Sequence, residues 1–262
     1  MSTARVLTVL FFSAAIMLLV SVPADGGAGK LTMKEKLGKC IFFDEDLSIN
    51  GNQSCATCHA SEVGWTGPDS DINAGGSVYE GSIPGRFGDR KPPSSAYATP
   101  SPVFGMDKKG LFVGGNFWDG RATGETLGNP AADQAQGPFL NPVEQALPDS
   151  ACVVYLVCTA SYSHLFRRVW GDDACDIQWV EDPEDPNYIL ATCKTEGATV
   201  SLSDAYRAKS NTAYDNIALS IAAYEASSEV NAFSSKYDFT FENSKKKAKL
   251  SKEEQKGSAL FW

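Results

Sequence analysis

Cys55-Ala56-Thr57-Cys58-His59 is the most informative stretch of this 262-residue chain. The pattern C-x-x-C-H is the attachment signature of a c-type haem. Two thiols one helical turn apart can each form a thioether with a haem vinyl group, and the adjacent imidazole then ligates the iron. The motif therefore predicts covalently bound haem c on Cys55 and Cys58, with His59 as the metal ligand.

Two other kinds of site use a C-x-x-C pair, and neither suits this sequence. A zinc site needs a second ligand pair, but the other histidine, His164, has no C-x-x-C near it. A redox dithiol of the thioredoxin type needs a βαβ context, which the residues around Cys55 do not provide. Chance spacing in a cysteine-containing loop is the remaining alternative.

Residues 1–24 are predicted to be a secretory signal peptide. Arg5 precedes an apolar run from Val6 to Val20, and small residues follow at the expected cleavage positions in Val22-Pro23-Ala24. The run is too short to cross a bilayer, although an uncleaved anchor is the alternative. Without residues 1–24 the chain loses one positive charge, Arg5, and its formal net charge moves from −9 to −10. We therefore expect an exported protein, in the periplasm or at the cell surface.

Export makes disulfides possible, and four cysteines cluster in the second half of the chain. They are Cys152, Cys158, Cys175 and Cys193. We predict two disulfides among them, with three pairings that the sequence cannot separate. Cys40 is left over and is interpreted as a buried small hydrophobic residue. The acidic balance argues against nucleic acid and anionic lipid and is compatible with a basic redox partner.

The residue pattern around the motif predicts an all-α fold with long irregular loops. Helices are expected over residues 32–43, 126–136, 141–147, 150–157, 161–170 and 203–230, and after a capping box at residues 251–254. Gly137-Pro138 is expected to separate the second helix from the third. Residues 64–115 have no regular period but contain many aromatic residues, which indicates a loop packed over a haem rather than disorder. No strand pattern is strong enough to predict a sheet.

Several further motifs occur in a fixed order along the chain. They are LGKCIFFD (37–44), Leu47-Ser48, SCATCH (54–59), FWDGRA (117–122), GPFLNPVE (137–144), IAAYE (221–225) and FSSKYD (233–238). In this order they resemble the bacterial di-haem cytochrome c peroxidase / MauG family, over most of residues 31–262. The resemblance implies an all-α cytochrome c-like haem domain, and a second haem in a complete member of the family.

The resemblance also implies a domain division. Residues 25–244 match the N-terminal, peroxidatic haem domain, and residues 245–262 match the linker and first helix of the second domain. The chain stops shortly before a second C-x-x-C-H would be expected. We therefore expect a fragment or a truncated protein, incomplete as a peroxidase without the second haem.

The resemblance implies roles for residues that the pattern alone would not single out. Gln134, Pro138 and Glu144 match residues on the distal side of the peroxidatic haem. A carboxyl there can move a proton between the peroxide oxygens, particularly if burial raises its pKa. Without the resemblance, Glu144 would be interpreted as a solvated helix residue. Trp118 matches the tryptophan that lies between the two haems and carries electrons, and a buried core position is the alternative or additional interpretation.

Neighbouring residues are interpreted as structural. Asp119 and Arg121 are expected to form a pair, with Arg121 near a haem propionate. The family's interdomain calcium takes an Asn before a Pro-containing segment. The corresponding stretch in this chain is Arg90-Lys91-Pro92-Pro93, which puts calcium at that place in doubt.

The sequence departs from the peroxidase branch in its distal ligand. Many of those enzymes place a displaceable histidine on the loop after the haem motif, yet residues 60–163 contain none. The sixth position of the iron is therefore expected to be open or water-ligated, as in the MauG-type branch. Met33, Met106 and His164 are the other candidate ligands, and His164 is interpreted as a helix surface residue.

Three functions follow from these expectations. The leading one is a haem-dependent peroxidase that reduces hydrogen peroxide with electrons from a small cytochrome c or a cupredoxin. The second is a MauG-type oxidase that modifies a partner protein. The third is a non-catalytic, mono-haem electron carrier. We expect no nucleic-acid partner and no membrane span after signal cleavage, and a homodimer is left open.

Overall fold

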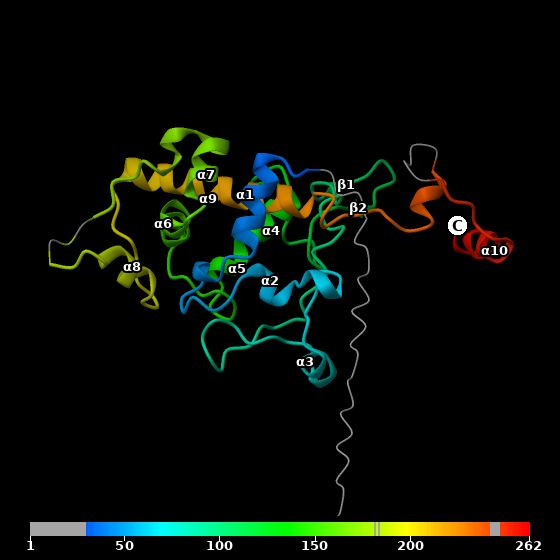
Figure 1. Cartoon of the computed structure of the whole chain (residues 1–262), viewed down its shortest axis with the longest axis horizontal. Helices are drawn as coiled ribbons and strands as arrows, with labels where there is room; N and C mark the ends of the chain where they lie inside the picture. The colour runs from blue at the N-terminus through cyan, green and yellow to red at the C-terminus, as the bar shows by residue number, and fades with distance from the viewer. Residues whose placement is uncertain (1–29, 181, 183, 242–246) are drawn as a thin grey trace, which may run out of the picture.

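The computed structural model describes residues 30–180, 182, 184–241 and 247–262. The predicted signal peptide and part of the predicted linker at residues 245–262 lie outside these ranges. Within them the fold is helical apart from one small sheet, which confirms the predicted all-α class (Figure 1). No helix in the described ranges combines the length and apolarity that a bilayer crossing requires.

The helices alternate with long loops from the N-terminal to the C-terminal part of the described chain. In chain order they are α1 (Met33–Phe42), α2 (Cys55–Cys58), α3 (Ser70–Gly75), α4 (Pro130–Ala135), α5 (Gly137–Leu140), α6 (Ser150–Thr159), α7 (Ser163–Trp170), α8 (Tyr188–Cys193), α9 (Asp204–Glu225) and α10 (Lys252–Phe261). Single 3₁₀ turns are η1 (Glu45–Leu47), η2 (Ser61–Val63), η3 (Asp172–Cys175) and η4 (Asp238–Thr240). Strands β1 (Gly105–Met106) and β2 (Phe112–Val113) are antiparallel, with Gly105 opposite Val113.

Helix α9 is the central element of the core. It packs against α1, α4 and α6, and Figure 1 shows it running behind α1 through the helical body. The Ser203 side chain caps its first turn by accepting a hydrogen bond from the backbone N–H of Tyr206. The residues predicted to share one face are all buried; they are Tyr214, Ile217, Ile221 and Tyr224. The helix ends at Glu225, earlier than the predicted limit of residue 230.

Helix α1 lies against α9 because a glycine allows close contact. Thr32 and Glu35 form a reciprocal capping box at its start. A Cβ atom on Gly38 would lie 1.9 Å from the backbone oxygen of Ser220 on α9. Even one methyl group at this position would therefore force the two helices apart.

We expect the Gly38→Ala variant to be less stable than the wild type by about 1–3 kcal/mol, the usual cost of overpacking a core. The matched control is Gly75→Ala, since a Cβ atom on Gly75 in α3 meets no atom within 4 Å. The control should change the free energy of unfolding by less than about 0.5 kcal/mol. Denaturant titration of the three proteins measures the difference, and equal stability of the two variants would contradict the close crossing.

Two disulfides tie the acidic segment between α7 and α9 to α6. Cys152 on α6 pairs with Cys193 on α8, and Cys158 pairs with Cys175 on η3. The prediction of two bridges among these four cysteines is therefore confirmed. Cys40 is free and half-buried, and burial raises the pKa of its thiol. Its burial is thus less complete than the sequence suggested.

Three local predictions were wrong. Residues 141–147 form turns rather than a helix, because the Asn141 side chain accepts a hydrogen bond from the Val143 N–H and Ala146 takes a left-handed conformation with φ 60°. Gly137-Pro138 begins α5 instead of separating two helices, as a proline is tolerated in a first helical turn. The stretch over residues 64–115 contains helix α3 and the small sheet, both too short to leave a periodic pattern.

Candidate functional site

The motif residues line one cavity of about 710 Å³, a size typical of small-molecule and cofactor sites. Its walls come from α2, the loops at residues 88–98 and 116–121, the segment from α4 to residue 145, and the end of α9. Every residue that the sequence analysis assigned to the site lies in this lining: Cys55, Cys58, His59, Trp118, Gln134, Pro138 and Glu144. The fold therefore brings together residues separated by up to 89 positions in the chain.

Helix α2 is a single turn that places both motif thiols in the cavity. The Ser54 N–H donates to the Thr57 hydroxyl at 3.0 Å, which fixes the start of the turn. Burial raises the pKa of both thiols, that of Cys58 to about 11, and the nearby carboxylate of Glu144 adds to this effect. Both groups are therefore neutral thiols near pH 7, one turn apart and facing the same space.

His59 is oriented by the backbone of the loop that follows. Its Nδ1 atom lies 3.2 Å from the carbonyl oxygen of Trp65, an acceptor only, so Nδ1 carries the proton and Nε2 keeps its lone pair. Trp65 has φ 63°, a left-handed conformation that is rare for an aromatic residue. Burial lowers the pKa of His59, against the opposing effect of hydrogen bonds to the carbonyls of Trp65 and Pro93. A neutral imidazole whose Nδ1 carries the proton can ligate iron through Nε2.

The cavity and its donor set fit a haem c. Two neutral thiols and an oriented imidazole share a space of cofactor size, as attachment and ligation of a c-type haem require. The lining also contains two buried acceptor atoms without a partner among the described residues, Oε1 of Gln53 and Oε1 of Gln145.

Glu144 is held in the cavity by the turn that follows α5. Its backbone N–H donates to the Asn141 carbonyl at 2.9 Å, and its own carbonyl accepts from the Ser82 N–H at 2.7 Å. Burial raises the pKa of its carboxyl, while the Asn141 side chain and the charge of Arg121 oppose the rise. A carboxyl with a raised pKa is suited to exchange protons near neutral pH.

The loop at residues 116–121 forms a charged rim. Asp119 pairs with Arg121 at 2.8 Å, which confirms the predicted pair, and also with Arg90 at 3.1 Å. The Arg121 guanidinium stacks on the ring of Phe117, with 3.7 Å between its Cζ atom and the ring centroid. Trp118 is 97% exposed, so the interpretation of a buried core tryptophan was wrong.

The alternative iron ligands lie elsewhere. His164 is exposed on α7 and its Nδ1 atom is 3.1 Å from the carbonyl oxygen of Ser161, as expected for a helix surface residue. Met106 on β1 is 63% exposed. Among the described residues that line the cavity, His59 is the only imidazole and there is no methionine.

Four buried residues of the lining were not predicted from the sequence as site residues: Gln53, Ser95, Gln145 and Glu225. Glu225 had appeared only within the IAAYE motif. A polar residue at the end of an apolar helix face was the signal that could have identified it.

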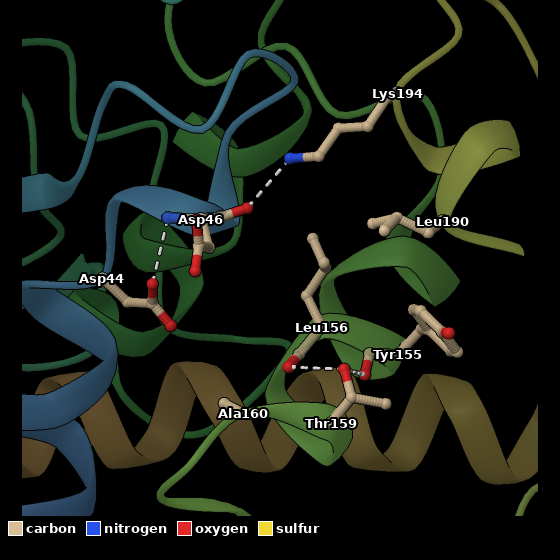
Figure 2. A pocket seen from close by; sticks show the side chains of 8 residues that line it. All are labelled: Asp44, Asp46, Tyr155, Leu156, Thr159, Ala160, Leu190 and Lys194. Carbon is tan, nitrogen blue, oxygen red and sulfur yellow. Dashed lines mark hydrogen bonds between the residues drawn. The ribbon is translucent and has the colours of Figure 1, made fainter. Parts of the chain in front are cut away.

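A second cavity of about 440 Å³ lies between α6, α8 and η1 and shares no residue with the first (Figure 2). Its polar groups are used within the fold. The Lys194 ammonium donates to the Asp46 carbonyl at 3.2 Å, and the Asp44 side chain accepts from the Asp46 N–H at 3.0 Å. The Thr159 hydroxyl donates to the carbonyls of Tyr155 and Leu156. We therefore take the cavity of Cys55, Cys58 and His59 as the candidate functional site.

Comparison with known proteins identifies relatives of this chain. Residues 32–246 match the family model described as di-haem cytochrome c peroxidase. The chain is 34% identical over 226 residues to methylamine utilization protein MauG of Paracoccus denitrificans, covering 84% of this chain and 48% of that protein. It is 35% identical over 114 residues to cytochrome c peroxidase Ccp of Escherichia coli, covering 43% of this chain and 19% of that protein.

The fold of this chain also resembles the solved structures of diheme peroxidases. The diheme peroxidase BthA from Burkholderia thailandensis aligns with a TM-score of 0.61 and 25% identity, covering 89% of this chain and 47% of that chain. The chain thus spans about half the length of MauG and of BthA.

Proposed function

This chain belongs to the di-haem cytochrome c peroxidase family, and we propose that its cavity is the peroxide-reducing haem site of a c-type haem oxidoreductase. The observation that carries the proposal is the placement of a partly buried carboxyl, Glu144, in the same cavity as Cys55, Cys58 and His59. A haem bound there supplies an iron that binds and reduces peroxide. In a complete protein we expect a second haem from the part of the family that this chain does not span.

The residues on one wall hold the cofactor. Cys55 and Cys58 form the two thioethers, and His59 ligates the iron through Nε2 while Nδ1–H stays bonded to the Trp65 carbonyl. On the rim, we propose that Arg121, which pairs with Asp119, contacts a propionate of the haem.

Other residues of the lining are proposed to act on peroxide. The carboxylate of Glu144 would accept a proton from one oxygen of the peroxide and donate it to the other, which would leave as water. The two electrons would come from the haem and its electron donor, and two solvent protons would release the remaining oxygen as a second water. The amide of Gln134 orients the peroxide through a hydrogen bond, and Pro138 closes the wall without adding a competing N–H.

Trp118 is proposed as the point of electron transfer. Its indole is almost fully exposed at the rim of the cavity, where it can contact another haem-bearing domain or a redox partner. The donor we propose is a small cytochrome c or a cupredoxin. Export is supported by the two disulfides, which form in oxidising compartments.

A MauG-type oxidase, which modifies a partner protein, is the second candidate. It is favoured by the cavity lining, which in the described chain offers no second imidazole and no methionine to cap the iron. The mono-haem carrier is not supported, because Met106 and His164 lie outside the lining.

The test measures peroxide consumption by the complete protein, loaded with both haems, in the presence of a reduced small cytochrome c. We expect the cytochrome to be oxidised in step with the loss of peroxide. Peroxide loss without cytochrome oxidation, and with oxidation of added protein side chains, would favour the MauG-type alternative. A haem-loaded protein that leaves peroxide intact would contradict both enzymatic proposals.

A further inference from the structure

Glu225 is a buried carboxyl of the cavity that the proposed reaction does not use. It is the last residue of α9, it is 5% exposed, and it lines the cavity beside Cys55. No ion pair between described residues includes it. Burial raises the pKa of Glu225 to about 8, and a hydrogen bond from the Ser95 side chain works against that rise.

Ser95 connects Glu225 to the histidine of the haem motif. Ser95 is 8% exposed, and its backbone N–H donates to the Trp65 carbonyl at 3.0 Å. The same carbonyl oxygen faces Nδ1 of His59 at 3.2 Å. Three hydrogen bonds therefore link the Glu225 carboxyl to the imidazole through Ser95 and the Trp65 carbonyl, with the covalent bonds of Ser95 joining its hydroxyl to its backbone N–H.

Packing fixes the middle of this path. The Trp65 backbone N–H donates to the Ala60 carbonyl at 2.8 Å. The indole of Trp65 makes edge-to-face contacts with Phe42 and Tyr224, at centroid distances of 5.8 and 5.9 Å. Tyr224 directly precedes Glu225, so at adjacent positions the end of α9 contacts the Trp65 ring and hydrogen-bonds Ser95, whose backbone N–H donates to the Trp65 carbonyl.

We propose that Glu225 is a positioning residue for His59, which acts through Ser95 and the Trp65 carbonyl to fix the imidazole and to couple the charge of a buried carboxyl to electron uptake by the haem. The inference rests on the proposed function, since it requires a haem on His59. Groups that orient a ligating histidine also set its basicity and the potential of the metal.

The sign of the coupling follows from electrostatics. A carboxylate near the iron stabilises the oxidised form, so the potential should fall as pH rises and Glu225 loses its proton. Other ionisable groups line the same cavity and must be controlled for. They are His59, Tyr79, Asp89, Arg90, Lys91, Asp119, Arg121, Glu144 and, before haem attachment, Cys55 and Cys58.

The test is the reduction potential of the haem attached at Cys55 and Cys58, measured from about pH 6 to about pH 10. The wild-type potential should fall by up to about 59 mV per pH unit, the value for a tenfold change in a one-electron equilibrium. Glu225→Gln should hold the low-pH potential throughout. Ser95→Ala should move the fall to higher pH, because the carboxylate loses its donor.

A second readout follows the imidazole itself. The iron–histidine stretch of the reduced protein, measured by resonance Raman, should shift in Glu225→Gln and in Ser95→Ala. The matched control is Glu229→Gln, which removes a carboxylate four positions further along, outside the cavity, where it pairs with Lys39. The control should keep the wild-type potential profile and stretch.

The possible negative results separate the role of Glu225, the role of Ser95 and the proposed function. A haem-loaded Glu225→Gln variant with the wild-type profile and stretch would overturn the role of Glu225 and leave the haem site standing. An unchanged Ser95→Ala variant would overturn the path through Ser95. A wild-type protein that binds no haem would overturn the proposed function, and this inference with it.

Discussion

Replacing Cys55 and Cys58 together with serine is expected to give a protein that carries no covalent haem. Both thiols lie in the cavity, and a hydroxyl does not form the thioether that C-x-x-C-H supports. Because a haem would fill a cavity of about 710 Å³, its loss should also lower the thermal stability. The measurement is the mass of the peptide containing residues 55–59, together with the visible absorption of the denatured protein.

The control for this prediction is Cys40→Ser. Cys40 is also a free, half-buried cysteine, but it does not line the cavity. That variant should keep the haem peptide and the visible absorption of the wild type. Retention of covalent haem by the double variant would show that the cofactor is attached elsewhere.

The Glu144→Gln variant is expected to lose about 10²–10⁴-fold in turnover with peroxide, the range typical of a general acid–base group. An amide keeps the shape of the side chain and one hydrogen-bond acceptor, but it cannot carry the transferred proton. The apparent affinity for peroxide should change much less than turnover. Steady-state kinetics with a reduced cytochrome separate the two effects.

The pH dependence of the same variant gives a second expected result. Burial raises the pKa of Glu144 above the ordinary range of a glutamate. To accept a proton from peroxide the carboxyl must be ionised, so wild-type turnover should rise as pH rises through that raised pKa. This rise of turnover with pH should be absent in Glu144→Gln.

The exposed Glu125, outside the cavity, offers the control Glu125→Gln. It should match the wild type in turnover and in pH profile. If Glu144→Gln keeps full turnover and the same rise of turnover with pH, Glu144 does not take part in the proposed proton transfer.

The spacing of apolar residues and the capping residues were sufficient to predict the main helices. Tyr214, Ile217, Ile221 and Tyr224 repeat with the helical period, and all four are buried on α9. The capping boxes at Thr32 and at Ser251 mark real helix starts. These features depend on neighbouring residues, so the sequence determines them directly.

Contacts between residues far apart in the chain could not be predicted from the sequence. The number of disulfides could be predicted, but Cys152 joins Cys193 only because α8 packs beside α6. The link from Ser95 to Glu225 joins residues 130 positions apart. The exposure of Trp118 depends on the conformation of the rim loop, on which the spacing of apolar residues gives no information.

The central claim is that His59 ligates a haem whose opposite face is open to a small oxidant. The most direct test is the EPR spectrum of the ferric wild-type protein, recorded for the haem attached at Cys55 and Cys58. The account predicts a high-spin signal, because no imidazole or methionine of the described lining reaches the opposite face. A purely low-spin signal that hydrogen peroxide leaves unchanged would contradict it.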